Sequence, residues 1–215
     1  MSEDISPLSD FAGTARLFPL PNLVLFPHVM QPLHIFEPRY RQMTADALAG
    51  DRLIALGLLR PGWEADYDGK PAIYPVACLG RVVAEQRLED GRFNILLRGL
   101  SRVRVVEELP QGKLYRTARV QLVDDAAPPE GQPARELRER LARAVAAWFP
   151  DKGAVYEQFR KLLRSELPLG PLSDIIAFAL PVDLEVKQGL LEELDVRQRV
   201  RRLLEYLEAH PQKPA

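Results

Sequence analysis

The stretch DDAAPPEGQP, residues 124–133, separates two parts of the chain that follow different hydrophobic periods. Its three prolines and one glycine disfavour both helix and strand, so a linker is expected here. Before it, apolar and polar residues mostly alternate and the turns are rich in Gly and Pro, which is typical of strands. After it, apolar residues recur every three or four positions, which is typical of amphipathic helices. The sequence therefore predicts an α+β protein whose strands precede its helices.

These periods divide the 215-residue chain into four predicted parts. Residues 1–14 are expected to form a flexible tail, and residues 15–125 a small β-barrel or pseudo-barrel. A linker over residues 126–133 leads to a helical bundle over residues 134–210. The length suits one large domain or two small ones.

Four local patterns refine the prediction for the first part. Asp90-Gly91 predicts a hairpin with a type I′ turn, and the apolar run Leu53–Leu59 predicts a strand that is buried on both faces. The short apolar run Leu23–Phe26 is interpreted as a strand near prolines, at an edge or a bulge. A single helix is expected over Pro38–Ala49, with Gly50 as its stop.

Five amphipathic helices are predicted in the second part. Pro150, Pro168 and Pro181 mark the ends of the first three. Asp183 and Asp195 stand where the N-caps of the last two would lie, and Gln198 lies where a capping box would place it. The arginines on these helices are interpreted as solvated faces with spaced salt pairs.

Bulk composition excludes several classes of protein. The net charge of -1, from 29 basic and 30 acidic residues, gives no overall attraction to nucleic acid or to an anionic membrane. The first 15 residues are acidic and lack an apolar run, so they do not resemble a secretory signal, and no stretch approaches the roughly 20 apolar residues that span a bilayer. The single cysteine, Cys78, has apolar neighbours and is interpreted as a buried core thiol. A cytoplasmic location is expected.

Residues for catalysis or metal binding are not gathered in any recognisable motif. The Gly-Lys pairs at Gly69 and Gly112 lack the other residues of a P-loop, and no serine lies in a Gly-x-Ser-x-Gly elbow. His28 and His34 are six residues apart without a nearby Cys, which is weak spacing for a metal site. We therefore expect no enzyme activity, no catalytic residue, no metal and no cofactor.

Arginines make the predicted barrel locally basic. One interpretation is an anion or RNA groove, and the other, which we favour, is a solvated sheet face with cross-strand ion pairs to residues such as Glu89 or Glu107. No aromatic residues interleave with the arginines as a stacking platform for bases would require. The residues concerned are Arg98, Arg102, Arg104, Arg116 and Arg119.

The loop over residues 61–71 places Trp63 and Tyr67 among acidic and turn-forming residues. Aromatic residues on a loop are candidates for contact with a partner. They could equally fold back onto the barrel as a lid, and the sequence does not separate the two alternatives.

Several segments, in order, resemble the Lon protease N-terminal domain family, and its free-standing bacterial form above all. The resemblance runs from about Leu17 to about Leu207. Cys78 and Leu79 lie inside the third segment. The segments are LFPLPNLVLFP (17–27), PLHIFEPRY (32–40), YPVACLGRV (74–82), LRGLSRVRV (97–105), and the helical stretch with LP (180–181), KQGLLE (187–192) and LDV (194–196).

The resemblance implies a PUA-like β pseudo-barrel followed by a helical bundle, and a role in binding protein substrates. In full-length Lon, an ATP-dependent protease, an ATPase and a Ser-Lys protease follow this region, and we expect neither here. The implied partners are unfolded or extended protein segments, with a separate protease or chaperone as a further candidate and the oligomeric state left open. The hypothesis has such segments docking on apolar surface between barrel and helices, using exposed strand edges and five candidate residues: Phe36, Arg39, Tyr40, Trp63 and Tyr67.

For Phe36, Arg39 and Tyr40 the stronger alternative is plain packing at a junction between strand and helix. Two other functions stay open for the whole chain. Some PUA-like barrels bind RNA, although the near-neutral charge argues against that here. A small-ligand pocket in the barrel is the other alternative.

Overall fold

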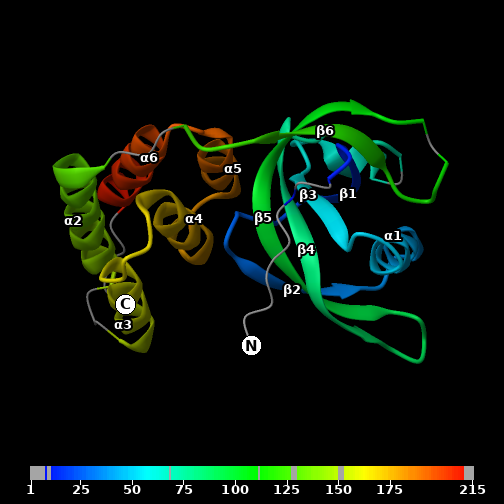
Figure 1. Ribbon diagram of the computed structural model, residues 1–215, viewed down its shortest axis with the longest axis horizontal. Coiled ribbons are helices and arrows are strands. Elements are labelled where there is room, and N and C mark those ends of the chain that lie inside the picture. Colours follow the sequence, from blue (N-terminus) through cyan, green and yellow to red (C-terminus); the bar gives the residue numbers. More distant parts are fainter. Residues whose placement is uncertain are drawn as a thin grey trace.

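The computed structural model describes residues 8, 11–67, 69–110, 112–126, 130–149 and 153–210. Strands come first and helices follow, with one helix inserted among the strands, so the predicted α+β class is confirmed (Figure 1). The strands are β1 (Thr14–Leu20), β2 (Met30–Ile35), β3 (Leu53–Leu58), β4 (Val76–Arg87), β5 (Phe93–Glu108) and β6 (Thr117–Val123). The helices are α1 (Pro38–Leu48), α2 (Gly131–Trp148), α3 (Ala154–Leu163), α4 (Leu169–Ala179), α5 (Leu184–Glu192) and α6 (Val196–Ala209), with a 3₁₀ turn, η2, over Trp63–Asp66.

Five strands close into a barrel because β6 pairs with β1 on one side and with β5 on the other. Around the ring the order is β1, β3, β4, β5, β6, with β1 and β3 parallel and the other neighbours antiparallel. β2 pairs with β5 outside this ring. Closure pairs each ring strand on both sides over part of its length, whereas in the described part of the chain β2 has one unpaired edge and residues 83–87 of β4 extend beyond β3.

Strand β3 is buried on both faces, as its continuous apolar run predicts. Ile54 and Leu56 pack in the large core that also holds α1 and the helical bundle. Leu53 and Ala55 pack in a second core built from small and branched side chains of β1, β4, β5 and β6. The alternation of side chains along one strand therefore divides β3 between two cores.

Strand β5 is 16 residues long and serves two neighbours on the same side. Residues 93–98 pair with β2 and residues 102–108 pair with β6. Between them lies Gly99, whose N–H donates to the Val29 carbonyl (2.8 Å) and whose carbonyl accepts from the His28 N–H (2.9 Å). A Cβ at this position would lie 2.0 Å from the Phe26 carbonyl oxygen, so only glycine lets the two backbones come this close.

Two local predictions for the barrel are wrong. The run Leu23–Phe26 forms no strand but a buried loop held against Gly99. The hairpin between β4 and β5 forms at Asp90-Gly91, but of these two residues only Gly91 has a positive φ, so the turn is not type I′. The Leu88 N–H donates to the Arg92 carbonyl, which leaves a three-residue loop closed by a left-handed glycine.

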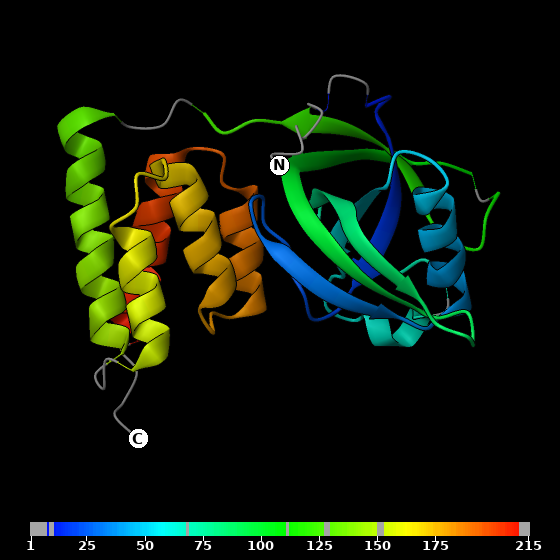
Figure 2. The same ribbon diagram turned by 60° about the horizontal axis from the view of Figure 1, so that its bottom comes forward.

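Helices α2 to α6 form a bundle beside the barrel, and the two halves share one continuous hydrophobic core (Figure 2). The Asp195 carboxylate caps α6 by accepting from the N–H groups of Arg197 and Gln198, as predicted. Asp183 stands at the N-cap of α5 but its side chain makes no capping hydrogen bond. Helix α2 begins at Gly131, inside the predicted linker, and the division of the chain into domains stays a prediction.

No helix in the described ranges is both long and apolar enough to cross a membrane. Cys78 is fully buried, as its neighbours predict.

Candidate functional site

The unpaired edge of β2 lies where the barrel meets the helices. β2 begins beside the helical bundle in both ribbon views (Figures 1 and 2). The Val29 carbonyl faces β5, so by alternation residues 31, 33 and 35 direct their backbone groups toward β5. Met30, Pro32 and His34 then direct theirs outward, and Pro32 has no N–H to leave unpaired there. The edge offers the N–H groups of Met30 and His34 and the carbonyls of these two residues to a further strand, while the Pro32 carbonyl already accepts from the Gln31 side-chain amide (2.7 Å).

The side chains at alternate positions of this edge are exposed. Met30 is 52% exposed and Phe36, just after the strand, is 59% exposed. His34 lies between them in sequence and stacks with Phe36, with ring centroids 6.2 Å apart. Pro32 is also exposed, so the four residues form a row on one face, with an apolar side chain at each end. We call these four residues the β2 row.

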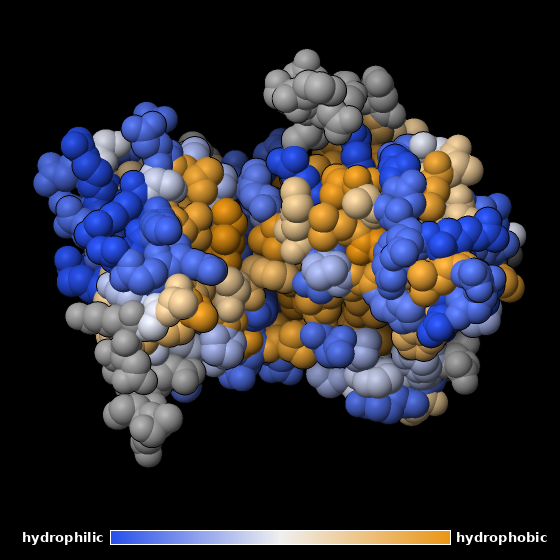
Figure 3. Space-filling view, turned by 90° about the horizontal axis from the view of Figure 1, so that it is seen from below, coloured by the Kyte–Doolittle hydropathy of each residue, from blue (hydrophilic) through white to orange (hydrophobic). Residues whose placement is uncertain are grey.

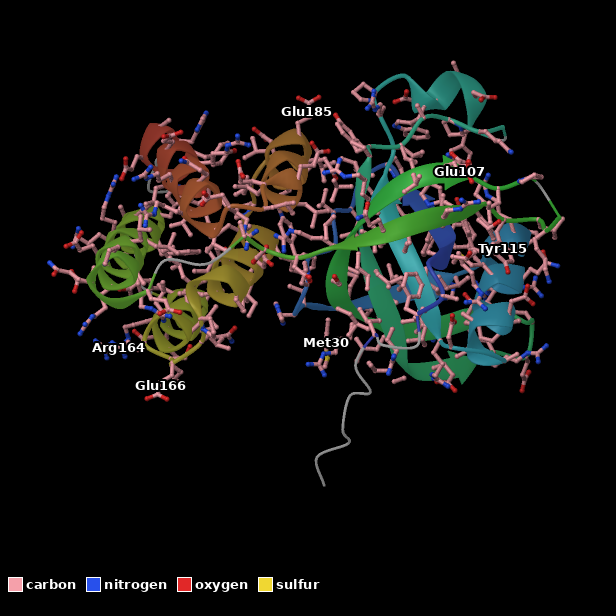
Figure 4. All side chains as sticks on the ribbon, turned by 45° about the horizontal axis from the view of Figure 1, so that its top comes forward. Met30, Glu107, Tyr115, Arg164, Glu166 and Glu185 are labelled. Atoms are coloured by element: carbon pink, nitrogen blue, oxygen red, sulfur yellow. The ribbon has the colours of Figure 1, made fainter. Side chains whose placement is uncertain are left out.

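Apolar surface gathers on both sides of the junction between barrel and bundle (Figure 3). The surface is hollowed between the two halves in this view, and strongly hydrophilic residues cover the outer ends. Figure 4 places Met30 at the bundle-facing end of β2. A contiguous apolar patch with a polar rim is typical of a surface that binds another chain.

Four of the five sequence-predicted site residues come together at the other end of β2, around Glu37. The Arg39 guanidinium pairs with the Glu37 carboxylate (2.9 Å) and donates to the Tyr67 carbonyl (3.2 Å). It also lies over the rings of Tyr40 and Tyr67, 4.8 and 4.7 Å from their centroids. The Tyr67 hydroxyl donates to Glu37 (2.9 Å), and Trp63 packs edge-on against Tyr67 at 5.4 Å. Phe36 is not part of this cluster and points its exposed ring toward His34 instead.

These contacts favour the lid alternative for the loop over residues 61–71. Tyr67 and Trp63 are half-buried against the barrel, and Tyr40 is only 5% exposed. Burial raises the pKa of Tyr40 to about 12, and its hydroxyl donates to the Pro19 carbonyl (3.3 Å). Beneath the loop, Arg39, Tyr40 and Tyr67 help to line a cavity of about 10 Å³, which has room for a single water molecule. The cluster thus offers a folded surface over a cavity too small for a ligand larger than water.

A buried ionic network fixes the barrel against the bundle. The Arg102 guanidinium of β5 donates to both oxygens of Asp174 in α4, at 2.9 and 2.7 Å, and to the Leu191 carbonyl at 2.9 Å. Arg199 of α6 donates to both oxygens of Asp125 at 2.8 and 2.5 Å, and its Nε lies 3.2 Å from Asp174. Burial lowers the pKa of Arg102, but the hydrogen bonds and charges of its aspartates raise it further, so the guanidinium stays charged. Two cations and two anions balance, and all of them except Asp125, whose side chain is 26% exposed, are shielded from solvent.

The solvated-face interpretation of the barrel arginines is therefore wrong for Arg102, whose side chain is 3% exposed. It is right for Arg119, which pairs across strands with the half-exposed Glu107 at 2.8 Å. The network was missed because strand periodicity shows which face is polar but not that a helix covers it. One signal was present in the sequence: Ser173-Asp174, a polar pair inside an apolar helix, where a buried carboxylate needs a cationic partner.

His28 lies close to this network in a left-handed backbone conformation (φ 67°). The side chain is exposed at the surface, but partial desolvation by its neighbours lowers its pKa, while the charges of Asp174 and Asp125 raise it and those of Arg102 and Arg98 lower it. As the pH falls below about 6.5, His28 is therefore protonated in the unfolded state before it is protonated in the folded state. The free energy of unfolding decreases between pH 6.5 and the lower pKa of the folded state. We expect His28→Asn, which tolerates positive φ, to lose less thermal stability than the wild type between pH 7 and 5.5. Equal losses of melting temperature in both proteins would contradict this account.

Within the described ranges no three His, Cys, Asp or Glu side chains gather as a metal site would require. The expectation of no catalytic residue and no cofactor stays a prediction.

Comparison with known proteins places the chain in a family. The model of the ATP-dependent protease La (LON) substrate-binding domain matches residues 14–209. Lon protease 2 of Myxococcus xanthus is 31% identical over 201 residues, which cover 92% of this chain and 24% of that protein. The Lon protease of Anaeromyxobacter dehalogenans is 28% identical over 201 residues, which cover 92% of this chain and 23% of that protein. The chain thus spans about a quarter of the length of these curated relatives.

Two solved structures share the fold. A Lon N-terminal domain protein from Xanthomonas campestris has a TM-score of 0.66 and 23% identity, over 90% of this chain and 98% of that one. The N-terminal domain of Mycobacterium avium complex Lon protease has a TM-score of 0.72 and 14% identity, over 92% and 99%. The family resemblance in the sequence is confirmed: with barrel and helices both inside the matched range, the chain belongs to the LON substrate-binding domain family.

Proposed function

We propose that this chain binds extended or unfolded protein segments at the junction of barrel and helices, and performs no ATPase or protease chemistry itself. The observation that carries the proposal is the unpaired edge of β2, whose exposed row begins with Met30 at the bundle-facing end of the strand (Figure 4). A separate protease or chaperone would then act on the bound segment. That partner, the cytoplasmic location and the oligomeric state stay predictions.

The backbone of β2 supplies the sequence-independent part of binding. A segment that pairs with Met30, Pro32 and His34 extends the sheet by one strand, and main-chain hydrogen bonds hold it whatever its sequence. An unfolded chain has free backbone groups along its length, whereas a folded protein pairs most of its own backbone groups. The edge thus favours extended or unfolded segments over folded proteins.

The ends of the β2 row supply apolar contact. Met30 is a flexible side chain that adapts to different shapes, and Phe36 offers an aromatic face. Trp63 and Tyr67 fold back as a lid but keep part of their rings exposed, so we retain them as proposed contacts at the Phe36 end. For Arg39 and Tyr40 we propose a supporting role, because their contacts hold the loop over residues 61–71 in place.

Charging both ends of the row tests this surface. We expect the double variant Met30→Glu/Phe36→Glu to bind a reduced, carboxymethylated unfolded chain at least tenfold more weakly, since charged ends cannot pack on apolar segments and about 1.4 kcal/mol corresponds to tenfold. Fluorescence anisotropy with labelled chain measures the dissociation constant. The matched control, Leu114→Glu/Val155→Glu, charges two equally exposed apolar residues elsewhere and should stay within twofold of the wild type.

A second measurement isolates the backbone contribution. A binding peptide with N-methyl groups at alternate residues, in the register that faces β2, cannot donate to the edge and should lose binding, while the same peptide methylated in the other register should retain it. If the two methylated peptides bind alike, strand addition at β2 is wrong. If the wild type binds no unfolded chain at all, the proposed function is wrong.

A further inference from the structure

A surface pocket of about 280 Å³ lies between helices α2 and α6, on the part of the bundle away from the β2 row. This volume is close to the lower limit of small-molecule sites, about 300 Å³. Three of its six lining residues are arginines from the two helices, and one is a carboxylate. The lining residues are Pro133, Glu136, Leu137, Arg140, Arg197 and Arg201.

The positive charge in this pocket is poorly compensated. Within the described ranges, neither Arg197 nor Arg201 has a carboxylate at ion-pair distance, whereas Arg199 and Arg202 of the same helix both do. The prediction of spaced salt pairs along α6 is thus wrong for the two arginines that face the pocket. Because Arg197 and Arg201 are four residues apart on one helix face, their like charges repel.

The two remaining charged groups leave the pocket cationic. Arg140 has only a long contact of 3.4 Å with Glu208, and both side chains are about half exposed. The Glu136 carboxylate accepts from the Gln132 amide at 2.9 Å, and it is the one acidic side chain in the lining. Three guanidinium groups and one carboxylate give a net charge near +2 in the lining at any pH near neutral.

Helix orientation adds to this potential. The Trp148 indole N–H, at the end of α2, donates to the Leu207 carbonyl near the end of α6 (2.9 Å). The pocket joins Pro133 and Glu136 to Arg197, near the starts of the same two helices. The helices therefore run parallel, and the positive ends of both helix dipoles lie at the pocket end of the pair, where the acidic N-cap residues Glu130 and Asp195 offset part of that potential.

We propose that this pocket binds a compact, multivalent oxyanion that carries phosphate or carboxylate groups. Guanidinium groups bind both phosphate and carboxylate through paired N–H donors. A ligand that carries several such anionic groups would also offset the repulsion between the arginines. The site belongs to the helical half alone and is independent of peptide binding at β2.

Isothermal titration of the whole chain with pyrophosphate and, separately, with citrate tests the proposal and distinguishes the two anion chemistries. Potassium chloride at matched ionic strength is the reference. We expect one site per chain for at least one anion, and at least a tenfold increase in dissociation constant for Arg197→Gln/Arg201→Gln. The control Arg143→Gln/Arg164→Gln removes the same charge at exposed positions outside the pocket lining and should stay within twofold of the wild type (Arg164 is labelled in Figure 4).

Three outcomes overturn the proposal: no binding beyond the chloride reference, equal weakening in both double variants, or binding without defined stoichiometry. Thermal melts without anion check that the pocket variant is folded, and it should melt no lower than the wild type because a repulsion has been removed. Pyrophosphate should then raise the melting temperature of the wild type but not of this variant.

Discussion

Arg102→Met is expected to lower the free energy of unfolding by about 3 kcal/mol, toward the low end of the roughly 3–5 kcal/mol seen when one partner of a buried ion pair is removed. Arg102 and Asp174 have side-chain exposures of 3% and 1%, so the abandoned carboxylate has no access to water. Arg199, whose Nε lies 3.2 Å from Asp174, keeps the loss from being larger. Methionine fills much of the same volume, so the measured loss reports the charge and its hydrogen bonds.

Chemical denaturation followed by far-ultraviolet circular dichroism measures the change. Arg119→Met is the matched control, because Arg119 pairs with Glu107 at the surface, where such pairs are worth about 1 kcal/mol or less. Asp174→Asn should also destabilise, and the double variant should lose less than the sum of the two single losses, because the residues share one network. Equal effects of Arg102→Met and Arg119→Met would show that the network does not fix barrel against bundle.

Gly99→Ala is expected to destabilise the fold by a similar amount, about 3 kcal/mol, at the upper end of the range for overpacking. The added Cβ would meet the Phe26 carbonyl oxygen at 2.0 Å and the Cys78 Sγ at 3.2 Å, and the first of these is backbone that cannot rotate away. The loop that carries Phe26 would have to separate from β5 and take buried residues with it.

Gly189→Ala provides the control for glycine replacement itself. Gly189 lies inside helix α5 and nothing lies within 4 Å of an added Cβ, so alanine should stabilise by about 0.5–1 kcal/mol through helix propensity. Opposite signs for the two variants in the same denaturation experiment are the expected result. A neutral Gly99→Ala would mean that the close approach at Phe26 has no part in holding the loop.

The sequence predicts most of the architecture because the spacing of apolar residues shows which face of each helix or strand is buried. The run Leu53–Leu59 and the stripes of the bundle could be assigned in this way, and Asp195 could be assigned as a cap. The run Leu23–Phe26 failed because burial alone does not make a strand. Its apolar residues fill the core from a loop, and Gly99, more than 70 residues later, pairs with His28 and Val29 just after it.

Site residues were harder to predict, since the contacts that group them join distant parts of the chain. The sequence named Arg39 and Tyr67, but their meeting through Glu37 depends on a loop 28 residues from Arg39. The β2 row could be suspected only from Phe36, because an unpaired strand edge is a property of the whole sheet. The pocket between α2 and α6 forms because these two helices run parallel, and no local sequence pattern predicts the relative direction of two distant helices.

The long strand β5 connects the β2 edge to the helical bundle, so a pulling force on a bound segment would pass through it. A segment paired with β2 and pulled along its length would load β2 and β5 in shear, the direction in which many backbone hydrogen bonds resist together. The same strand carries Arg102, so that load would pass through Asp174 into α4 and the bundle. Traction on a bound chain would thus be carried by the helical half as well as by the barrel that holds it.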